Sequence, residues 1–466
     1  MTRIVQAVRD NGAPPDATAL VVNGRVWTYR ELLASAERVA AALARRDVPG
    51  ESVVARTADP AATAVLVLGC DLAGVPLVHR DAAAPGGAVG PIAQDGPTDH
   101  VGGTALSEEP SLRLTGKGRS DLPDGVPAGA QVFLTSGSTG VPTGVVRTSA
   151  AVLADARRVG GFLGYGPDAP VAVAAPLFHA YGFNYGLIAP LVLGAPVRFC
   201  PVRSVPSRLL AAVHGHGART LIALPFHYAL LAQAAAAREG LATPPSLALA
   251  VSAGAPLGPG VAAAIAERFT FRLHNCYGSS EAGAVTLAPV SGGEADGWVG
   301  VPLPGVAAEV VQSADDDLPR GELRLRTTSL AFGRIGPAGL VPLDLDEEGR
   351  YRTGDLALPP AAEGALRLAG RIGTLINVAG KKVAPVEIER VLAEHPAVAD
   401  VRVSASPDRA HGQVPVAEVV LRAPAPELVR WCRDRLAPHQ VPRRITEVPS
   451  IPRSATGKPI HREVVR

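Results

Sequence analysis

The residues best suited to hold an anion lie in segment 132–148, VFLTSGSTGVPTGVVRT, where an apolar strand runs into hydroxyls and glycines. Gly137, Gly140 and Gly144 let backbone N–H groups close around a phosphate, because glycine tolerates positive φ and close approach. The Walker pattern G-x-x-x-x-G-K-[ST] is absent, so this is not an ordinary kinase or ATPase loop. A solvated turn has the same composition. The choice between phosphate loop and surface turn therefore depends on residues further along the chain.

Composition and charge exclude several classes of protein. The chain has 466 residues, enough for two or three domains with substantial cores. Its 45 Lys and Arg against 43 Asp and Glu leave a net charge of +2, which gives no electrostatic reason to expect a nucleic-acid or membrane partner. Without a secretion signal or an apolar run of about 18 residues, the chain is predicted to be soluble and cytoplasmic. The cysteines show no metal-ligand spacing; they are Cys70, Cys200, Cys276 and Cys432.

Hydrophobic periodicity predicts a layered α/β architecture for most of the chain. Thr28 is placed to cap a helix over 30–44, and a second helix is expected over 61–73. Between 130 and 290, strands alternate with helices, which is typical of α/β layers with mainly parallel strands. These strands are expected at 132–134, 171–174, 197–199, 220–223 and 247–251. Residues 298–356 are predicted to be β-rich, whereas 81–130 show no assignable pattern.

The last hundred residues have the pattern of a separate α+β unit. Pro385 suits a helix start, and one buried face follows at Ile388, Val391, Leu392 and His395. Strands are expected at 398–404 and 414–421, and a second helix at 426–436. We therefore predict a large N-terminal domain over 1–370, with mixed sheets flanked by helices and a small β-rich subdomain. A small mobile C-terminal α+β domain over 371–466 is expected on a hinge near Gly373.

Four further motifs follow the glycine-rich loop in order. They are NCYGSSEAG at 275–283, YRTGD at 351–355, GRIGTLINVAGKKVAPVEIE at 370–389 and PRSATGK at 452–458. Together with TSGSTG and the PLFH segment at 176–179, they resemble the adenylate-forming superfamily of acyl-CoA synthetases, aryl-acid ligases and adenylation domains of peptide synthetases. The resemblance extends from about residue 20 to the C-terminus. Six motifs in this order are far more specific than any one of them.

This resemblance implies a two-step ligase. Members of the superfamily join a carboxylate to the α-phosphate of ATP, release pyrophosphate, and pass the acyl group to a thiol or another nucleophile. Because two anions must meet, such a site needs cations and oriented amides where charge accumulates. The implied cofactors are ATP, Mg²⁺ and CoA, or the phosphopantetheine of a carrier protein.

The resemblance also implies roles for the residues near the phosphates. The β- and γ-phosphates would be held by Thr135, Ser136, Gly137, Ser138, Thr139 and Gly140. Ser280 would contact the α-phosphate, and Glu281 would ligate Mg²⁺. Lys458 would bridge the substrate carboxylate and the α-phosphate, where an ammonium stabilises charge in the transition state. For Glu281 the structural alternative is an ion pair with a neighbouring base.

The adenosine site is implied by three further segments. Asp355 would accept hydrogen bonds from the ribose hydroxyls, with Arg371 helping to fix the sugar. The adenine ring would lie between one strand and a loop, formed by Asn275, Cys276 and Tyr277 and by Gly254 and Ala255. The alternatives are a turn cap for Asp355 and a domain-interface salt bridge for Arg371. Lys381 and Lys382 are either surface charges or contacts for CoA phosphates.

Three positions depart from the superfamily pattern. Thr143 stands where many relatives have lysine, so a charge near the pyrophosphate is missing, and Arg147 or another basic residue is a candidate to compensate. Gly373 occupies the hinge position that is often Asp or Lys, and Asn377 stands where lysine is common. Glycine allows the large φ/ψ changes of a domain rotation, although a loosened hinge is equally consistent.

Aromatic residues are concentrated where the resemblance places the acid pocket. The proposed pocket residues are Phe178, Tyr181, Phe183, Phe226 and Gly278, with Tyr185 and Tyr228 nearby. His179 resembles the gating residue of coumarate- and benzoate-type CoA ligases, and the aspartate that binds an α-ammonium is missing. Flat aromatic walls favour an aryl, cinnamate-like or medium apolar acid. The alternative is that these rings pack a helix into the core.

Three functions remain open on the sequence. The first is a free-standing acid–CoA ligase. The second keeps adenylation but delivers the acyl group to an acyl-carrier protein acting in trans, or to an amine-like nucleophile in a biosynthetic pathway. The third is a non-catalytic homologue that acts as a binding protein, suggested by Thr143, Gly373 and Asn377. Retention of Glu281, Asp355 and Lys458 favours an enzyme.

Overall fold

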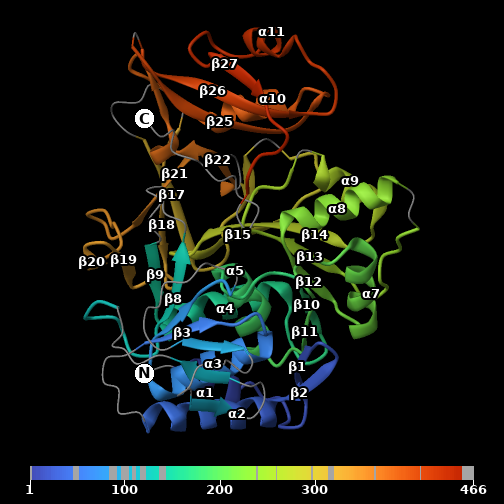
Figure 1. Cartoon of the computed structure of the whole chain (residues 1–466), viewed down its shortest axis with the longest axis vertical. Helices are drawn as coiled ribbons and strands as arrows, with labels where there is room; N and C mark the ends of the chain where they lie inside the picture. Colours follow the sequence, from blue (N-terminus) through green and yellow to red (C-terminus); the bar gives the residue numbers. More distant parts are fainter. Residues whose placement is uncertain are drawn as a thin grey trace.

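A computed structural model describes most of the chain. The described residues are 3–45, 52–82, 92–95, 104–107, 112–115, 122–135, 143–237, 240–258, 260–294, 297–312, 320–360, 364–409 and 411–453. Figure 1 shows a large body that carries most of the elements and a smaller body, built from the C-terminal elements, above it.

The first large sheet is mainly parallel, as predicted. Its order is β15-β14-β13-β12-β10-β11-β1-β2, and only the edge strands β2 and β15 pair antiparallel. The strands are β1 (Thr18–Val22), β2 (Arg25–Thr28), β10 (Val171–Val173), β11 (Val197–Phe199), β12 (Thr220–Ala223), β13 (Leu249–Ser252), β14 (Arg272–Ser279) and β15 (Gly283–Pro289). The strands expected at 171–174, 197–199, 220–223 and 247–251 lie in this sheet, whereas the one expected at 132–134 lies in the second large sheet. The parallel strands of the first sheet end at one common edge.

The second large sheet pairs the strands on either side of the glycine-rich segment with a hairpin from a distant part of the chain. Its order is β20-β19-β9-β8-β4-β3-β5-β7-β6. The strands are β3 (Val53–Arg56), β4 (Leu77–His79), β5 (Ile92–Asp95), β6 (Thr104–Ser107), β7 (Leu112–Thr115), β8 (Gln131–Thr135), β9 (Thr143–Arg147), β19 (Gly333–Gly336) and β20 (Gly339–Val341). Because β9 pairs with β19, residues almost two hundred positions apart lie side by side. Nothing in the sequence pattern predicted that contact.

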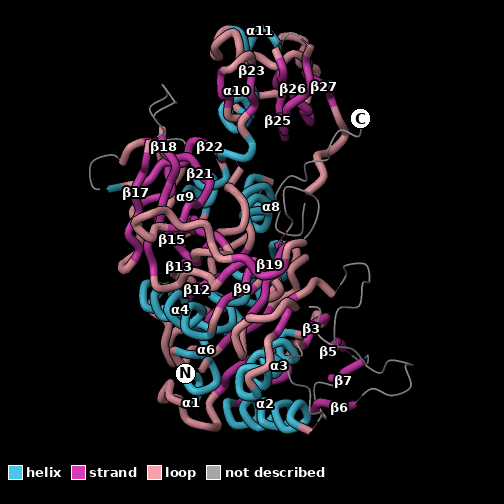
Figure 2. The backbone as a smooth tube through the Cα atoms, turned by 90° about the vertical axis from the view of Figure 1, so that its left-hand side faces the viewer, coloured by secondary structure: helices cyan, strands magenta, loops and turns pink. Residues whose placement is uncertain are grey.

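Helices pack against and between these sheets (Figure 2). They are α1 (Ile4–Arg9), α2 (Tyr29–Ala44), α3 (Pro60–Ala73), α4 (Ser149–Leu163), α5 (Ala180–Phe183), α6 (Ala189–Val192), α7 (Pro206–His216), α8 (Pro225–Ala236), α9 (Val261–Arg268) and the π-helix η1 (Asn184–Ile188). Thr28 caps α2 as predicted, in a reciprocal capping box with Glu31. In the described part of the chain, no helix is both long and apolar enough to cross a bilayer.

The β-rich region forms a third, antiparallel sheet. Its order is β16-β22-β21-β18-β17, from β16 (Trp298–Gly300), β17 (Val306–Val311), β18 (Gly321–Thr327), β21 (Tyr351–Leu358) and β22 (Leu366–Arg371). Glu348 and Gly349 lie in the turn that leads into β21, where the Gly349 N–H donates to the Asp346 carbonyl at 2.9 Å.

The C-terminal elements have a sheet and a core of their own. The elements are the 3-10 helix η3 (Ile372–Thr374), β23 (Ile376–Val378), β24 (Lys381–Val383), α10 (Pro385–Ala393), β25 (Val398–Asp408), β26 (Gly412–Leu421), α11 (Leu428–Arg433) and β27 (Arg444–Glu447). Ile388, Val391, Leu392 and His395 are all buried, as the periodicity predicted. The second helix is shorter than expected.

The structure gives a reason for asparagine at position 377, where lysine is common in the superfamily. The Asn377 side-chain oxygen accepts from Gly380 N–H at 2.9 Å in the β23–β24 turn.

Candidate functional site

Several of the predicted N-terminal site residues lie just beyond the carboxyl ends of neighbouring strands. His179 follows β10, Phe226 follows β12, Gly254 follows β13, and Glu281 follows β14. These four strands lie next to one another in the sheet and pair in parallel. Ligands of open α/β sheets bind in the crevice outside such strand ends. The fold therefore collects residues from 179 to 281 at one edge.

The predicted adenosine residues from two sheets meet in one hydrogen-bonded cluster. Tyr277 Oη donates to Asp355 Oδ2 at 2.7 Å, and Arg371 Nε lies 3.1 Å from Asp355 Oδ1. Pairing of β21 with β22 sets Asp355 directly opposite Arg371. Burial and the adjacent Asp355 carboxylate raise the pKa of Tyr277, so its phenol stays a neutral donor. The Asp355 carboxylate thus joins two other predicted site residues instead of capping a turn.

Glu281 is held by a residue that the sequence analysis missed. Arg334 Nε and Nη2 each lie 2.9 Å from Glu281 Oε1, and Nη2 donates to Tyr351 Oη at 2.7 Å. Arg334 lies on β19, and Tyr351 begins β21. Glu281 thus forms the ion pair with a base that the sequence analysis gave as the alternative to magnesium binding. Arg334 carries no local sequence signal, because its partners Glu281 and Tyr351 lie 53 and 17 positions away along the chain.

The surroundings of Glu281 fit a magnesium ion that is also held by phosphates. Both Arg334 contacts fall on Oε1, and the Glu281 side chain retains 15% exposure. Among the described residues no group of three or more His, Cys, Asp and Glu side chains is placed to hold a metal. Mg²⁺ is commonly bound through one or two carboxylates together with substrate phosphates and water. A single carboxylate beside the predicted nucleotide site suits that mode.

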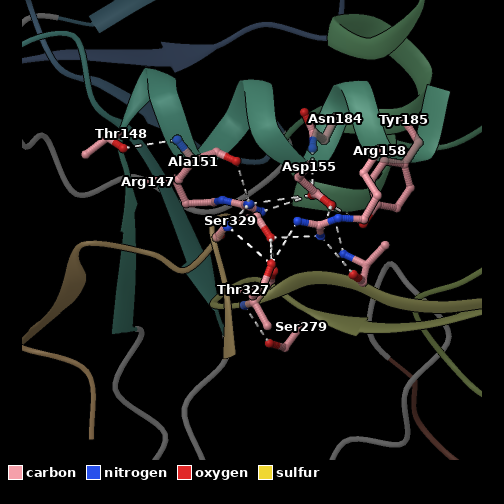
Figure 3. A network of polar contacts seen from close by, with 12 residues as sticks. Arg147, Thr148, Ala151, Asp155, Arg158, Asn184, Tyr185, Ser279, Thr327 and Ser329 are labelled. Carbon is pink, nitrogen blue, oxygen red and sulfur yellow. Dashed lines mark hydrogen bonds and ion pairs between the residues drawn. The ribbon is translucent and has the colours of Figure 1, made fainter. Parts of the chain in front are cut away.

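A buried polar network fixes the turn that carries Ser280 and Glu281 (Figure 3). Asp155, on α4 and fully buried, accepts from the Ala284 N–H at 3.0 Å through Oδ1 and from Asn184 Nδ2 at 2.6 Å through Oδ2. A Cβ at Gly283 would lie 2.5 Å from this carboxylate, so only glycine permits the approach. The turn begins at Ser279, whose Oγ accepts from Ala282 N–H at 3.0 Å. The turn is therefore anchored at both ends.

Arg147 belongs to the same network and does not compensate for Thr143. Its guanidinium is 1% exposed, lies 3.5 Å from Asp155 Oδ2, and donates to the Ser329 carbonyl at 3.0 Å. The expectation that Arg147 supplies charge to the phosphate loop is therefore wrong. Thr143 and Arg147 share a face of β9, but four residues of strand separate them by about 13 Å.

The aromatic residues of the predicted acid pocket divide into two groups. Phe183 is buried in the core, with its ring centroid 4.8 Å from His79 and 5.0 Å from Phe133. Tyr181 Oη donates to the Val251 carbonyl at 2.8 Å, which ties it to the β13 backbone. For these rings the alternative of core packing describes the contacts. Phe178 and Phe226 are only half-buried, and the Phe178 ring lies 4.4 Å from that of His179.

Two predicted site residues on β14 have structural explanations. The Cys276 side chain is buried in the core, whereas Asn275 and Tyr277 alternate to the other face of the strand. The Cys276 side chain therefore cannot lie against an adenine ring on the same face as Tyr277. At Gly278, a Cβ would lie 2.2 Å from the Gly283 carbonyl oxygen, so glycine is required by the β14–β15 pairing.

Several predicted residues lie outside the described part of the chain. They are Ser136, Gly137, Ser138, Thr139, Gly140 and Lys458, together with the side chain of Thr135. Of the remaining nucleotide residues, Gly254 has a φ of 93°, which favours glycine, and Ala255 follows it in the same bend.

Family models cover both parts of the chain. The model described as AMP-binding enzyme matches residues 8–101 and 104–333, and the model described as AMP-binding enzyme C-terminal domain matches 387–458. Sulfoacetate–CoA ligase of Cupriavidus necator is 31% identical, over 75% of this chain and 69% of its own. The 4-hydroxybenzoate–CoA/benzoate–CoA ligase of Rhodopseudomonas palustris is 30% identical, over 75% and 67%. For the medium-chain fatty-acid–CoA ligase of Escherichia coli, at 30% identity, the shares are 71% and 59%.

Solved structures share the fold over nearly the whole chain. The o-succinylbenzoate CoA synthetase of Bacillus subtilis, in complex with an acyl-adenylate intermediate, has a TM-score of 0.78 at 23% identity, with 98% of this chain and 96% of that one covered. An amide bond synthetase of Marinactinospora thermotolerans has a TM-score of 0.78 at 26% identity, with 98% and 97% covered.

These matches confirm the superfamily, the large and small domains of its fold, and the enzyme class. The class is that of AMP-forming acid–thiol ligases, and ATP, Mg²⁺ and CoA are its cofactors. The chain belongs to the AMP-binding enzyme family of adenylate-forming ligases.

Proposed function

We propose that this chain activates an aryl, cinnamate-like or medium apolar carboxylic acid as its acyl-adenylate and then transfers the acyl group to CoA. The observation that carries the proposal is the cluster of Tyr277, Asp355 and Arg371, which lies at the strand-end edge beside Glu281. This arrangement offers two carboxylates and a cation from separate elements of the fold. It suits a nucleotide whose ribose and phosphates must be held apart and oriented.

The chemistry of the first step sets what the site must do. A carboxylate oxygen of the acid forms a bond to the α-phosphorus of ATP, and the bond from that phosphorus to the bridging oxygen breaks to release pyrophosphate. In our proposal, Asp355 accepts hydrogen bonds from the ribose hydroxyls and Ser280 contacts the α-phosphate. Lys458 bridges the substrate carboxylate and the α-phosphate as they approach. Glu281 would hold Mg²⁺, which offsets the charge of the triphosphate.

In the second step, the CoA thiol gives up its proton to solvent and its sulfur forms a bond to the acyl carbon, while the bond from that carbon to the phosphate oxygen breaks and AMP leaves. We propose the domain boundary at 370–371 and a rotation about Gly373 between the two steps. Gly373 lies in η3, and a Cβ there would meet nothing within 4 Å, so sterics do not require glycine at this position. Glycine at this position also gives the backbone the freedom that a rotation needs. Rotation would break the contact of Arg320 Nη1 with Glu387 Oε1, which is 2.9 Å long.

The acid class rests on Phe178, His179 and Phe226, which are half-buried and follow strands β10 and β12 at the strand-end edge. Benzoate and medium-chain acids are named as substrates of two relatives. The test is acid-dependent ATP–pyrophosphate exchange over a panel of aryl, cinnamate-like, aliphatic and amino acids, with mass spectrometry of the product made with CoA. Exchange with amino acids and background rates with aryl and aliphatic acids would refute this class.

A second candidate keeps the adenylation step and delivers the acyl group to an amine or to an acyl-carrier protein. The amide bond synthetase of Marinactinospora thermotolerans favours the amine, because its fold matches 98% of this chain at 26% identity. Replacing CoA by amines or by a phosphopantetheinylated carrier protein in the product assay separates these acceptors. A cytoplasmic location remains a prediction.

Asp355→Asn is expected to raise the KM for ATP about 10- to 100-fold, because a charged acceptor for hydroxyl donors becomes a mixed amide. The measurement is exchange kinetics with ATP varied at saturating acid. Asp344→Asn is the control: its carboxylate is mostly exposed and lies 3.9 Å from Arg352. An unchanged KM for ATP in Asp355→Asn would remove Asp355 from the ribose site.

A further inference from the structure

The phosphate side of this site lacks the cation that the resemblance places at position 143, and Arg147 is committed to Asp155. Arg334 is a second cation near the same strand. Pairing of β19 with β9 sets Arg334 directly opposite Val145. Residues that lie opposite each other share a face of the sheet, and so do alternate residues of one strand. Arg334 and Thr143 therefore lie on one face, as diagonal neighbours about 7–8 Å apart.

The guanidinium is oriented, and it has donors to spare. Its contacts with Glu281 and Tyr351 use Nε and Nη2. In the part of the chain that the structure describes, Nη1 has no protein acceptor, and the side chain is 33% exposed. Tyr351 is almost fully buried, so its hydroxyl gives the guanidinium a fixed partner. An arginine held on one edge in this way presents its other N–H groups to a ligand without first losing side-chain entropy.

We propose that Arg334 is the cation that takes the place of a lysine at position 143 and binds the phosphates that leave as pyrophosphate. The proposal rests on the proposed function and names a further residue of the same site. Glu281 would then pair with Arg334 through Oε1 and also hold the metal. A planar guanidinium between a carboxylate and a phosphate satisfies both acceptors, which a lysine ammonium does less well.

The test measures binding of inorganic pyrophosphate and of Mg·ATP to the whole chain by isothermal titration calorimetry, without acid. Arg334→Gln is expected to weaken pyrophosphate binding about 10- to 100-fold, as loss of a charge-assisted contact does. Adding Thr143→Lys to Arg334→Gln is expected to raise the pyrophosphate affinity again by at least about tenfold. Arg352→Gln is the matched control, because Arg352 is adjacent to Tyr351 but lies on the opposite face of β21. The pyrophosphate affinity of Arg352→Gln should change less than about twofold.

Two results would overturn the proposal. One is pyrophosphate affinity of Arg334→Gln within about twofold of the unmodified chain, and the other is failure of Thr143→Lys to restore it. If Arg334→Gln does not fold, Thr143→Lys in the unmodified chain decides. If Arg334 already supplies the charge, Thr143→Lys should raise the pyrophosphate affinity less than about threefold. A rise of about tenfold or more would show that the charge is missing from the unmodified chain and would overturn the proposal. Acid-dependent exchange by the unmodified chain tests the proposed function separately.

Discussion

Asp155→Ala is expected to lower the free energy of unfolding by about 3–5 kcal/mol, the cost of breaking a buried ion pair by removing one partner. Asp155 is fully buried, and its carboxylate is the acceptor for Arg147, Asn184 and Ala284 N–H. Removing it leaves the Arg147 charge buried without a carboxylate. It also frees the backbone that leads out of the turn with Ser280 and Glu281. Urea unfolding followed by circular dichroism measures the loss.

Asp16→Ala is the matched control for Asp155→Ala. Asp16 also pairs with an arginine, Arg30, at 2.8 Å, but the two side chains are 77% and 63% exposed. Exposed pairs contribute about 0–1 kcal/mol, so the control should be nearly silent. Asp155→Asn keeps the shape and one acceptor oxygen, and is expected to fall between the two. A loss below 1 kcal/mol in Asp155→Ala would show that the network contributes little to stability.

The sequence predicted the layers of the fold because their signals are local. Thr28 and Glu31 form the capping box within four residues, and the face of α10 repeats every three to four. The parallel sheet followed from strand and helix alternation. Boundaries were less accurate, as in α11, which spans Leu428–Arg433 where 426–436 was expected.

The site was predicted where a motif has a fixed place along the chain, and missed where tertiary pairing decides. Tyr277, Asp355 and Arg371 each lie in a motif, and the structure brings them together. Arg334 lies in no motif and meets Glu281 across 53 positions of sequence. Strand pairing of this range is not encoded in local pattern. Composition also misled the pocket prediction, because an aromatic such as Phe183 serves a core wall as well as a ligand wall.

Lys458→Ala is expected to reduce acid-dependent ATP–pyrophosphate exchange about 100- to 1,000-fold, the effect of removing one donor that stabilises charge developing in a transition state. Position 458 lies outside the described residues, and the assignment comes from the PRSATGK motif. The effect should fall on kcat more than on the KM for ATP, since the ammonium acts where the two anions approach. Exchange kinetics with ATP and acid varied in turn provide both constants.

The second half-reaction makes the Lys458 prediction specific. When the acyl-adenylate is supplied ready-made, its carboxylate is already joined to the α-phosphate, and the bridging ammonium has no pair of anions to bring together. Lys458→Ala should then form the CoA thioester within about fivefold of the unmodified rate. Lys382→Ala removes the same charge from an exposed position of β24 and should leave exchange unchanged. Equal exchange in Lys458→Ala and the unmodified chain would assign the bridging role to another cation. A parallel loss of both half-reactions would mean that Lys458 supports the C-terminal domain as a whole instead of the adenylation step.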